Sequence, residues 1–284
     1  MTGDVALPET GLQWYAGLEM QLISAENCTR LGRTRHYGPL RIQRPFWPEG
    51  PELAHIYTLH PPGGLVAGDE LIQQFEAGPG AAGLVTTPSA GKVYFNNSKR
   101  QQKQNIVIRV ADQAGIEWLP QETILFDGAD AVMSLDVQLS GKGTYIGWDI
   151  LCLGRQASGE SFDSGRLLQT VNLSRNGLPL FRDRLEFTAG DDRHQGLLGL
   201  HKQPVLGTML ATVNREPPVA EWHGQLVEPC ASGQLSLTWR AGVLIVRYLG
   251  DSSRQARELF EKTWALCRPM VNDREACRPR IWNT

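Results

Sequence analysis

A strict alternation of apolar and polar residues is the feature that most constrains the fold of this chain. Every second residue from Met133 to Leu139 is apolar, and the residues between them are polar. The same period of two recurs over residues 106–110 and 234–240. Because successive side chains of a β-strand point to opposite faces, this period predicts strands that are buried on one face only.

Turn-forming residues separate the alternating runs. Pro61-Pro62-Gly63-Gly64 and Asn176-Gly177 are typical, and the 284 residues include 30 glycines and 17 prolines. Such sequences favour tight turns between strands. The pattern therefore predicts a mostly β chain of many short strands, arranged as a sandwich, a barrel or a solenoid. The periodicity does not choose among these three.

One segment instead has the period of an α-helix. Ser252 followed by Gln255 matches a capping box, and residues 256–267 then carry a single apolar stripe. Pro269 predicts the end of this helix. We therefore expect about two α-helices, one over residues 251–268 near the C-terminus and one shorter helix elsewhere.

The composition argues against two classes of partner. The formal net charge is −2, from 28 basic and 30 acidic residues, which gives no overall attraction to nucleic acid or to an anionic membrane. No run approaches the roughly 18 apolar residues of a membrane helix. The first residues also lack the features of a signal peptide. We expect a cytoplasmic protein that binds neither nucleic acid nor a membrane.

Several common chemistries lack their motifs. The stretch 78–83 matches G-x-G-x-x-G, but residues 84–88 resemble a strand, where the dinucleotide fingerprint needs a helix. Gly91-Lys92 is followed by valine, so it is not a phosphate-binding loop. The six histidines and five cysteines show no metal-ligand spacing, and no G-x-S-x-G occurs. Nucleotide binding, a tight metal site and serine-hydrolase chemistry have no support.

Carboxylates within apolar strand patterns are the candidates for function. Asp69 follows a glycine turn, Asp149 lies inside the apolar run 145–153, and Asp183 lies among apolar residues. A buried charge is costly unless it is paired, hydrated or bound to a metal. Each of these residues therefore faces solvent, pairs with an arginine, or lines a polar cavity.

A basic cluster lies earlier in the chain and has aromatic neighbours. Basic residues beside aromatic ones can bind single-stranded nucleic acid. Because the chain is nearly neutral overall, we favour strand arginines that cover apolar surface or meet an acidic protein partner. The cluster consists of Arg30, Arg33, Arg35, Arg41 and Arg44.

A series of short segments, in order along the chain, resembles one known family. The series contains His60-Pro61-Pro62-Gly63-Gly64 with Gly68-Asp69, Glu117-Trp118-Leu119-Pro120-Gln121-Glu122, Gly147-Trp148-Asp149-Ile150, Gly154-Arg155 with Gly159-Glu160, and Pro279-Arg280-Ile281-Trp282. Together these resemble the UreD (UreH) family of urease accessory proteins, from about residue 15 to the end. Ala67 and Asp183 depart from its usual glycine and glutamate. The motif residues are His60, Gly63, Gly64, Glu117, Trp118, Gln121, Glu122, Arg155 and Glu160.

The resemblance implies a fold and a role. The fold is a single β-helix-like domain over residues 15–284, after a loose tail at 1–14. The role is that of a non-catalytic scaffold that binds the accessory protein UreF, reaches the GTPase UreG through it, and docks on urease apoprotein. Nickel in transit would cross a polar internal passage, with no cofactor tightly bound. Weakly holding oxygen ligands suit such transit, and the candidates are Asp69, Asp149, Asp183, Thr86, Thr87 and Glu52.

Two other hypotheses stay open. One is a β-solenoid enzyme acting on polysaccharide, with Asp69, Asp149 or Glu160 as acid and base. A secretion signal and a repeating coil period would favour it, and the sequence shows neither. The other is a β interaction module without a metal role.

Overall fold

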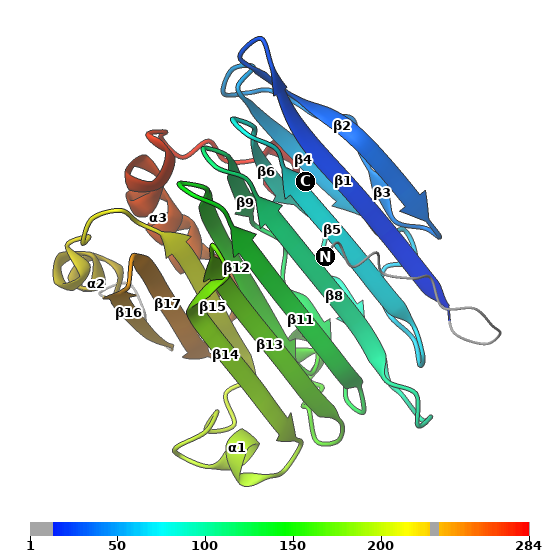
Figure 1. Cartoon of the computed structure of the whole chain (residues 1–284). Helices are drawn as coiled ribbons and strands as arrows, with labels where there is room; N and C mark the ends of the chain where they lie inside the picture. Colours follow the sequence, from blue (N-terminus) through cyan, green and yellow to red (C-terminus); the bar gives the residue numbers. More distant parts are fainter. Residues whose placement is uncertain (1–13, 228–232, 284) are drawn as a thin grey trace.

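The computed structural model describes residues 14–227 and 233–283, which form two facing β-sheets and their covering helices (Figure 1). The first sheet has the order β14 (Leu178–Thr188), β13 (Arg166–Arg175), β11 (Asp130–Leu139), β8 (Gln102–Val110), β5 (Glu70–Ala77), β1 (Tyr15–Ala25), β2 (Cys28–Tyr37). The second has the order β16 (Gln234–Arg240), β17 (Val243–Gly250), β15 (Val205–Thr212), β12 (Thr144–Leu153), β9 (Gly115–Trp118), β6 (Ala82–Thr86), β4 (Leu53–Leu59), β3 (Arg41–Ile42). The short strands β7 (Gly91–Val93) and β10 (Thr123–Leu125) pair with each other, and β10 also pairs with β12.

The strands follow one another as the coils of a solenoid. The chain runs from β5 in the first sheet to β6 in the second, continues through β7, and returns to the first sheet as β8. β8, β9 and β10 repeat this path, and β11 and β12 begin it again. Strands of successive coils pair in parallel. A parallel pair usually needs a helical crossover, whereas here a strand of the opposite sheet makes the return. The predicted mostly β, β-helix-like architecture is confirmed.

Two apolar layers hold the fold together. The first lies between the sheets and contains Phe75 and Trp118, whose ring centroids are 5.3 Å apart. The second lies between the second sheet and the helix α3 (Ser253–Asn272) and contains Trp148 and Phe260. The second sheet is thus covered on both faces, except at its edge strand β16, where every second residue is exposed. For this reason β4 is buried at every residue from 53 to 58 and shows no alternation.

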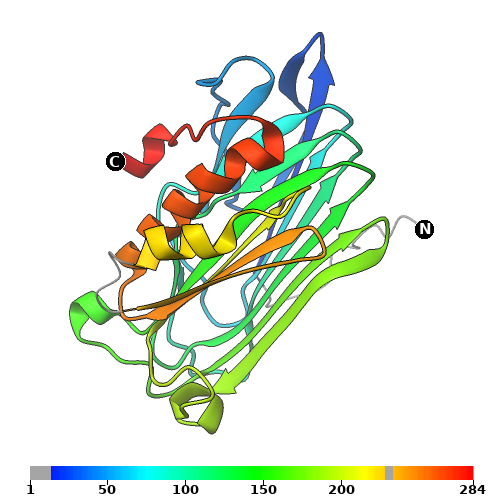
Figure 2. The same cartoon turned by 90° about the vertical axis from the view of Figure 1, so that its left-hand side faces the viewer.

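The helices cover one side of the second sheet, as Figure 2 shows for α3 and α2 (Val219–Val227). The predicted cap of α3 is confirmed, because the Ser252 hydroxyl accepts a hydrogen bond from the backbone N–H of Gln255. A third, very short helix, α1 (Asp192–Gln195), follows β14. Single 3₁₀ turns lie at Gln156–Ser158 and Arg280–Asn283.

The predicted end of the C-terminal helix at Pro269 is wrong. α3 continues through the proline to Asn272, and Asp273 ends it in the left-handed conformation with a φ of 56°. A proline inside a helix removes one backbone hydrogen bond. Two side chains of the last turns compensate, since Arg268 and Asn272 both bind Glu117 on the sheet beneath.

Replacing Ser252 with alanine should lower the free energy of unfolding by about 1 kcal/mol, because the Gln255 N–H would lose its partner at the start of α3. Chemical denaturation of the two proteins measures this difference. Ser161→Ala, in an exposed loop, serves as the matched control. Equal midpoints for wild type and Ser252→Ala would show that the cap is not needed.

No helix among the described residues is both long and apolar enough to cross a membrane. The expected loose tail at 1–14 falls almost entirely outside the described residues.

Candidate functional site

A cavity of about 410 Å³ lies between the two sheets. Part of its lining comes from the loop after β4, which contains His60, Gly63 and Gly64, and from residues 88–92 around β7. Trp118 and Pro120 line it from the second sheet side. The polar residues around it are Thr58, His60, Gln73, Thr87, Ser89, Lys92, Gln104, Gln121, Thr123, Ser134, Asp149, Gln169 and Thr170.

The glycines of the loop are required by its close packing. A Cβ on Gly64 would lie 2.5 Å from the Tyr94 ring and 2.9 Å from the Lys92 carbonyl oxygen. Gly63 has a φ of 78°, which side chains disfavour. Burial lowers the pKa of His60 below its usual value, so this imidazole is neutral at physiological pH. Its Nε2 has no hydrogen-bond partner within the described part of the chain.

Amides at core-facing strand positions make part of the largely apolar cavity lining polar. Gln73 on β5, Gln104 on β8 and Gln169 on β13 stand where the alternation would place apolar side chains. Gln73 is only 6% exposed. Neutral amides offer oxygen ligands and N–H donors at a lower desolvation cost than charges.

Asp149 is the carboxylate of this cavity. It projects from β12 in the second sheet, and its Oδ2 accepts a hydrogen bond from the Gln169 amide of the first sheet. Burial raises the pKa of Asp149 to about 6, although the bonds from Gln169 and from the backbone of Ile150 oppose this. Near neutral pH this residue therefore changes between a neutral acid and an anion.

Asp183 lines a second cavity of about 330 Å³. Its Oδ2 accepts a hydrogen bond of 2.9 Å from Arg247 on β17. Gln169 and Thr208 also line this second cavity, and Thr208 is the register partner of Asp149 across β12 and β15. Two of the three predicted aspartates thus face neighbouring cavities that share one residue.

Thr86 and Thr87 lie on opposite faces of the second sheet. Thr87 lines the 410 Å³ cavity, where its hydroxyl accepts a hydrogen bond from the Gln121 N–H at 2.9 Å. Thr86 faces the C-terminal segment, donates to the Leu119 carbonyl and accepts from the Trp282 indole at 2.8 Å. Thr87 can offer an oxygen to the cavity, whereas Thr86 fixes the C-terminal segment.

Asp69 and Glu52 are not among the residues that line either cavity. Asp69 closes the turn before β5: its Oδ2 accepts the Val66 N–H at 2.8 Å, and its own N–H donates to the Val66 carbonyl. Burial raises its pKa. Glu52 is largely exposed and pairs with Arg274 at 2.7 Å.

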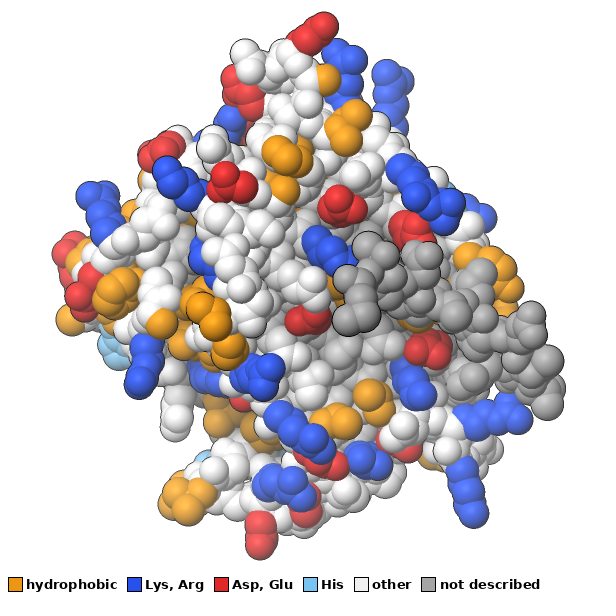
Figure 3. All heavy atoms as spheres, viewed as in Figure 1, with side chains coloured by type: hydrophobic (Ala, Val, Ile, Leu, Met, Phe, Trp, Pro, Cys, Tyr) orange, Lys and Arg blue, Asp and Glu red, His pale blue; other side chains and the backbone are white. Residues whose placement is uncertain are grey.

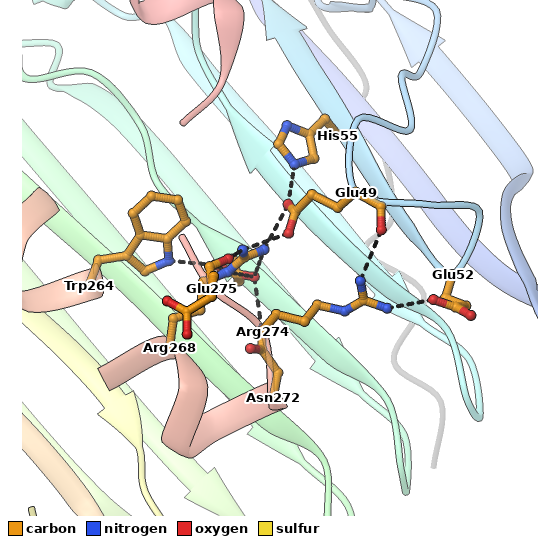
Figure 4. Close-up of polar contacts among 9 residues, drawn as sticks. Glu49, Glu52, His55, Trp264, Arg268, Asn272, Arg274 and Glu275 are labelled. Atoms are coloured by element: carbon orange, nitrogen blue, oxygen red, sulfur yellow. Dashed lines mark hydrogen bonds and ion pairs between the residues drawn. The ribbon is translucent and has the colours of Figure 1, made fainter. Parts of the chain in front are cut away.

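Glu117 belongs to a buried ion network under α3. Figure 4 shows Arg268 of α3 reaching between the sheet and the loop before β4. Its guanidinium bonds to Glu117 at 3.0 Å and to Glu49 at 2.6 and 2.8 Å. The Trp264 indole also donates to Glu117 at 2.6 Å, and Arg268 is fully buried.

Glu49 extends this network to the second sheet, because it bonds to His55 on β4 at 2.6 Å. Burial alone would raise the pKa of Glu49, but the bonds from His55 and Arg268 outweigh it and hold the pKa at about 2. The carboxylate therefore stays charged at all physiological pH values.

The same place contains the one group of His, Cys and carboxylate side chains in the described residues with metal-like spacing. Glu49, His55 and Cys277 offer ligand atoms within 4.8 Å of one another. Both carboxylate oxygens of Glu49 already bind the Arg268 guanidinium, which supplies the positive charge there. The cluster is an ion network rather than a metal centre.

The remaining motif residues stabilise turns and helix contacts. Glu122 pairs with Arg257 of α3 at 3.1 Å. Arg155 and Glu160 form a two-pronged ion pair, with distances of 2.9 and 3.0 Å, in the turn after β12. Among the carboxylates suggested for a polysaccharide enzyme, only Asp149 lines a cavity. Asp69 and Glu160 have the structural contacts described above.

Sequence reasoning missed Gln169, Gln73 and the network of Glu49, His55 and Arg268. The two glutamines carried a readable signal, since each interrupts an apolar alternation: Leu71-x-Gln73-x-Phe75 and Leu167-x-Gln169-x-Val171. The network carried none, because Arg268 and Glu117 are 151 residues apart in the chain.

Comparison with known proteins gives matches over nearly the whole chain. A family model described as UreD urease accessory protein matches residues 15–283. A Urease accessory protein UreD from Saccharophagus degradans is 41% identical over 286 residues, which cover 98% of this chain and 96% of that protein. One from Dechloromonas aromatica is 40% identical over 286 residues, which cover 99% and 98%. The family resemblance indicated by the motif series is confirmed.

Proposed function

This chain belongs to the UreD family of urease accessory proteins, and we propose that it serves urease maturation by carrying nickel ions through the space between its two sheets. In this proposal the ions are cargo and the protein is a scaffold without catalytic chemistry of its own. The observation that supports it most is Asp149, a carboxylate that faces a cavity inside the fold whose lining includes several amides and hydroxyls.

The chemistry of the two cavities suits transit better than storage. Nickel binds tightly where several imidazoles or thiolates converge, and leaves slowly from such sites. The cavity that Asp149 lines has amides and hydroxyls, including those of Gln169, Gln73 and Thr87, and two basic side chains, His60 and Lys92. A single carboxylate in this lining attracts a divalent cation and still lets it go.

The ion would pass between the two aspartates that face the cavities. Asp149 lines the first cavity and Asp183 the second, and the pairing of Asp183 with Arg247 keeps the second carboxylate partly neutralised. An arginine beside a carboxylate weakens its hold on a cation. Asp69 and Glu52 are not part of this path. Thr86 is not part of it either, and its hydroxyl holds the C-terminal segment in place.

The scaffold role requires partners on both sides of the passage. We propose that a UreF-type protein binds this chain and brings the GTPase UreG, which releases nickel, while the urease apoprotein receives it. Pull-down of a tagged copy, coexpressed with the accessory proteins and urease, tests this assembly.

Replacing Asp149 with asparagine should lower the nickel content of matured urease to well below half of the wild-type value. The substitution preserves the shape of the side chain and removes the charge that attracts the cation. Metal per urease active site is measured by atomic emission, and a pull-down on the same sample checks that the complex still forms. Asp136→Asn, on the outward face of β11, is the matched control and should load nickel normally.

Wild-type nickel content in the Asp149 variant, with the complex intact, would remove the passage from the proposed function. Loss of the complex itself would instead assign Asp149 to assembly.

A further inference from the structure

We propose that Gln169 is a gate between the two cavities, and that a cation crosses from one aspartate to the other by displacing its amide. The inference rests on the proposed function and adds a residue that controls the step between Asp183 and Asp149. The geometry points to Gln169 because it lines both cavities, whereas Asp149 lines only the first and Asp183 only the second.

The cross-strand neighbours of Gln169 in its own row of the first sheet are both apolar. Across the strands its register partners are Met133 on β11 and Leu185 on β14. Met133 lines the first cavity and Leu185 lines the second. The amide is therefore the polar group that a cation meets as it moves along this row of the sheet.

The hydrogen bond of Gln169 closes the junction when no cation is present. Its Nε2 donates to Asp149 Oδ2, so the side chain bridges the interior from one sheet to the other. This bond occupies one carboxylate oxygen that a cation would otherwise use. Displacement of the amide by a water molecule would gain little free energy, because one neutral hydrogen-bond donor would replace another.

A divalent cation favours the opposite orientation of the Gln169 amide, with its oxygen toward the cation. The N–H end of an amide is repelled by a cation, and the carbonyl end is an oxygen ligand for it. The terminal torsion of glutamine has a broad, roughly two-fold profile, so the amide can turn over without moving the strand. The same side chain thus blocks the junction when the cation is absent and binds the cation during passage.

The decisive test compares nickel transfer in complexes that contain variants of Gln169. In the complete accessory complex with apo-urease, Gln169→Leu should slow nickel transfer about tenfold, the effect of losing one ligand worth about 1.4 kcal/mol. Leucine has a similar size and is compatible with a buried position. A thermal melt checks that the variant folds. Gln104→Leu, which changes the same residue type in the first cavity alone, should have a much smaller effect.

Gln169→Glu tests the gate through the amount of nickel that the protein retains. This amount would not change if Gln169 had only a structural role. A carboxylate at the junction faces Asp149 and creates a two-carboxylate site, so nickel should stay with the protein through gel filtration while its transfer slows. Metal retained per chain is measured by atomic emission after incubation with nickel salt alone. Wild-type protein should retain much less.

The outcomes separate this inference from the proposed function. Normal transfer by Gln169→Leu, with Asp149→Asn still defective, overturns the gate and leaves the passage in place. Equal slowing by Gln169→Leu and Gln104→Leu also overturns the gate, because polarity in general would then matter. Normal transfer by Asp149→Asn removes the passage itself.

Discussion

Replacing Arg268 with methionine should lower the free energy of unfolding by about 3–5 kcal/mol, the usual cost of leaving buried charges without their partner. Arg268 is fully buried and binds both Glu49 and Glu117. Methionine fills much of the volume but leaves two carboxylates facing each other in the interior. Chemical denaturation, followed by tryptophan fluorescence, measures the loss.

Two controls separate charge from volume in this experiment. Arg254→Met lies on the exposed face of the same helix and removes a surface pair with Glu258, so its effect should stay within about 0.5 kcal/mol. Adding Glu49→Gln and Glu117→Gln to Arg268→Met should recover much of the loss, because neutral amides tolerate burial better. A single Arg268 variant as stable as wild type would show that the network contributes nothing.

Asp149→Asn should make the protein more stable at neutral pH, even as it impairs nickel delivery. The folded-state pKa of Asp149 is about 6, above its ordinary value of 3.8, so the folded protein binds the proton more tightly than the unfolded chain. Stability therefore falls as the pH rises from about 4 through 6, and above that the ionised carboxylate costs up to about 3 kcal/mol. Asparagine does not ionise and avoids this cost.

Thermal melts of wild type and Asp149→Asn across this pH range test the sign of the effect. The difference between the two proteins should be small near pH 4 and should grow toward pH 7. A difference that does not depend on pH would mean that Asp149 is not held in a desolvated place. The expected result makes Asp149 a residue that lowers stability, which is common for functional groups and rare for structural ones.

The period-two pattern predicted the strands of the first sheet because that sheet is buried on one face. From Met133 to Leu139 the apolar residues face the core as expected. Most strands of the second sheet are covered on both faces and carry no such signal, whereas its edge strand β16 keeps the alternation. The helix end predicted at Pro269 came too early, because the side chains that stabilise the last turn bind a carboxylate far away in the sequence.

Individual residues of the candidate site could be predicted on their strands, but their positions relative to one another could not. Asp149 and Asp183 could be selected because each interrupts an apolar pattern. Their relation through Gln169 depends on the pairing of β11, β13 and β14, which is set by contacts between distant segments. Thr86 and Thr87 show the same limit, since adjacent residues of a strand face opposite sides and the sequence does not say which side is the cavity.

The arginines of β2 have a consequence for how copies of this protein behave in solution. β2 is a ten-residue strand at one end of the solenoid, and Arg30, Arg33 and Arg35 are exposed on it. Figure 3 shows basic side chains along the border of the molecule where β2 lies. A long edge strand is a template for joining another chain. Two copies that met through β2 would set guanidinium groups against each other, and this repulsion discourages end-to-end growth into fibres.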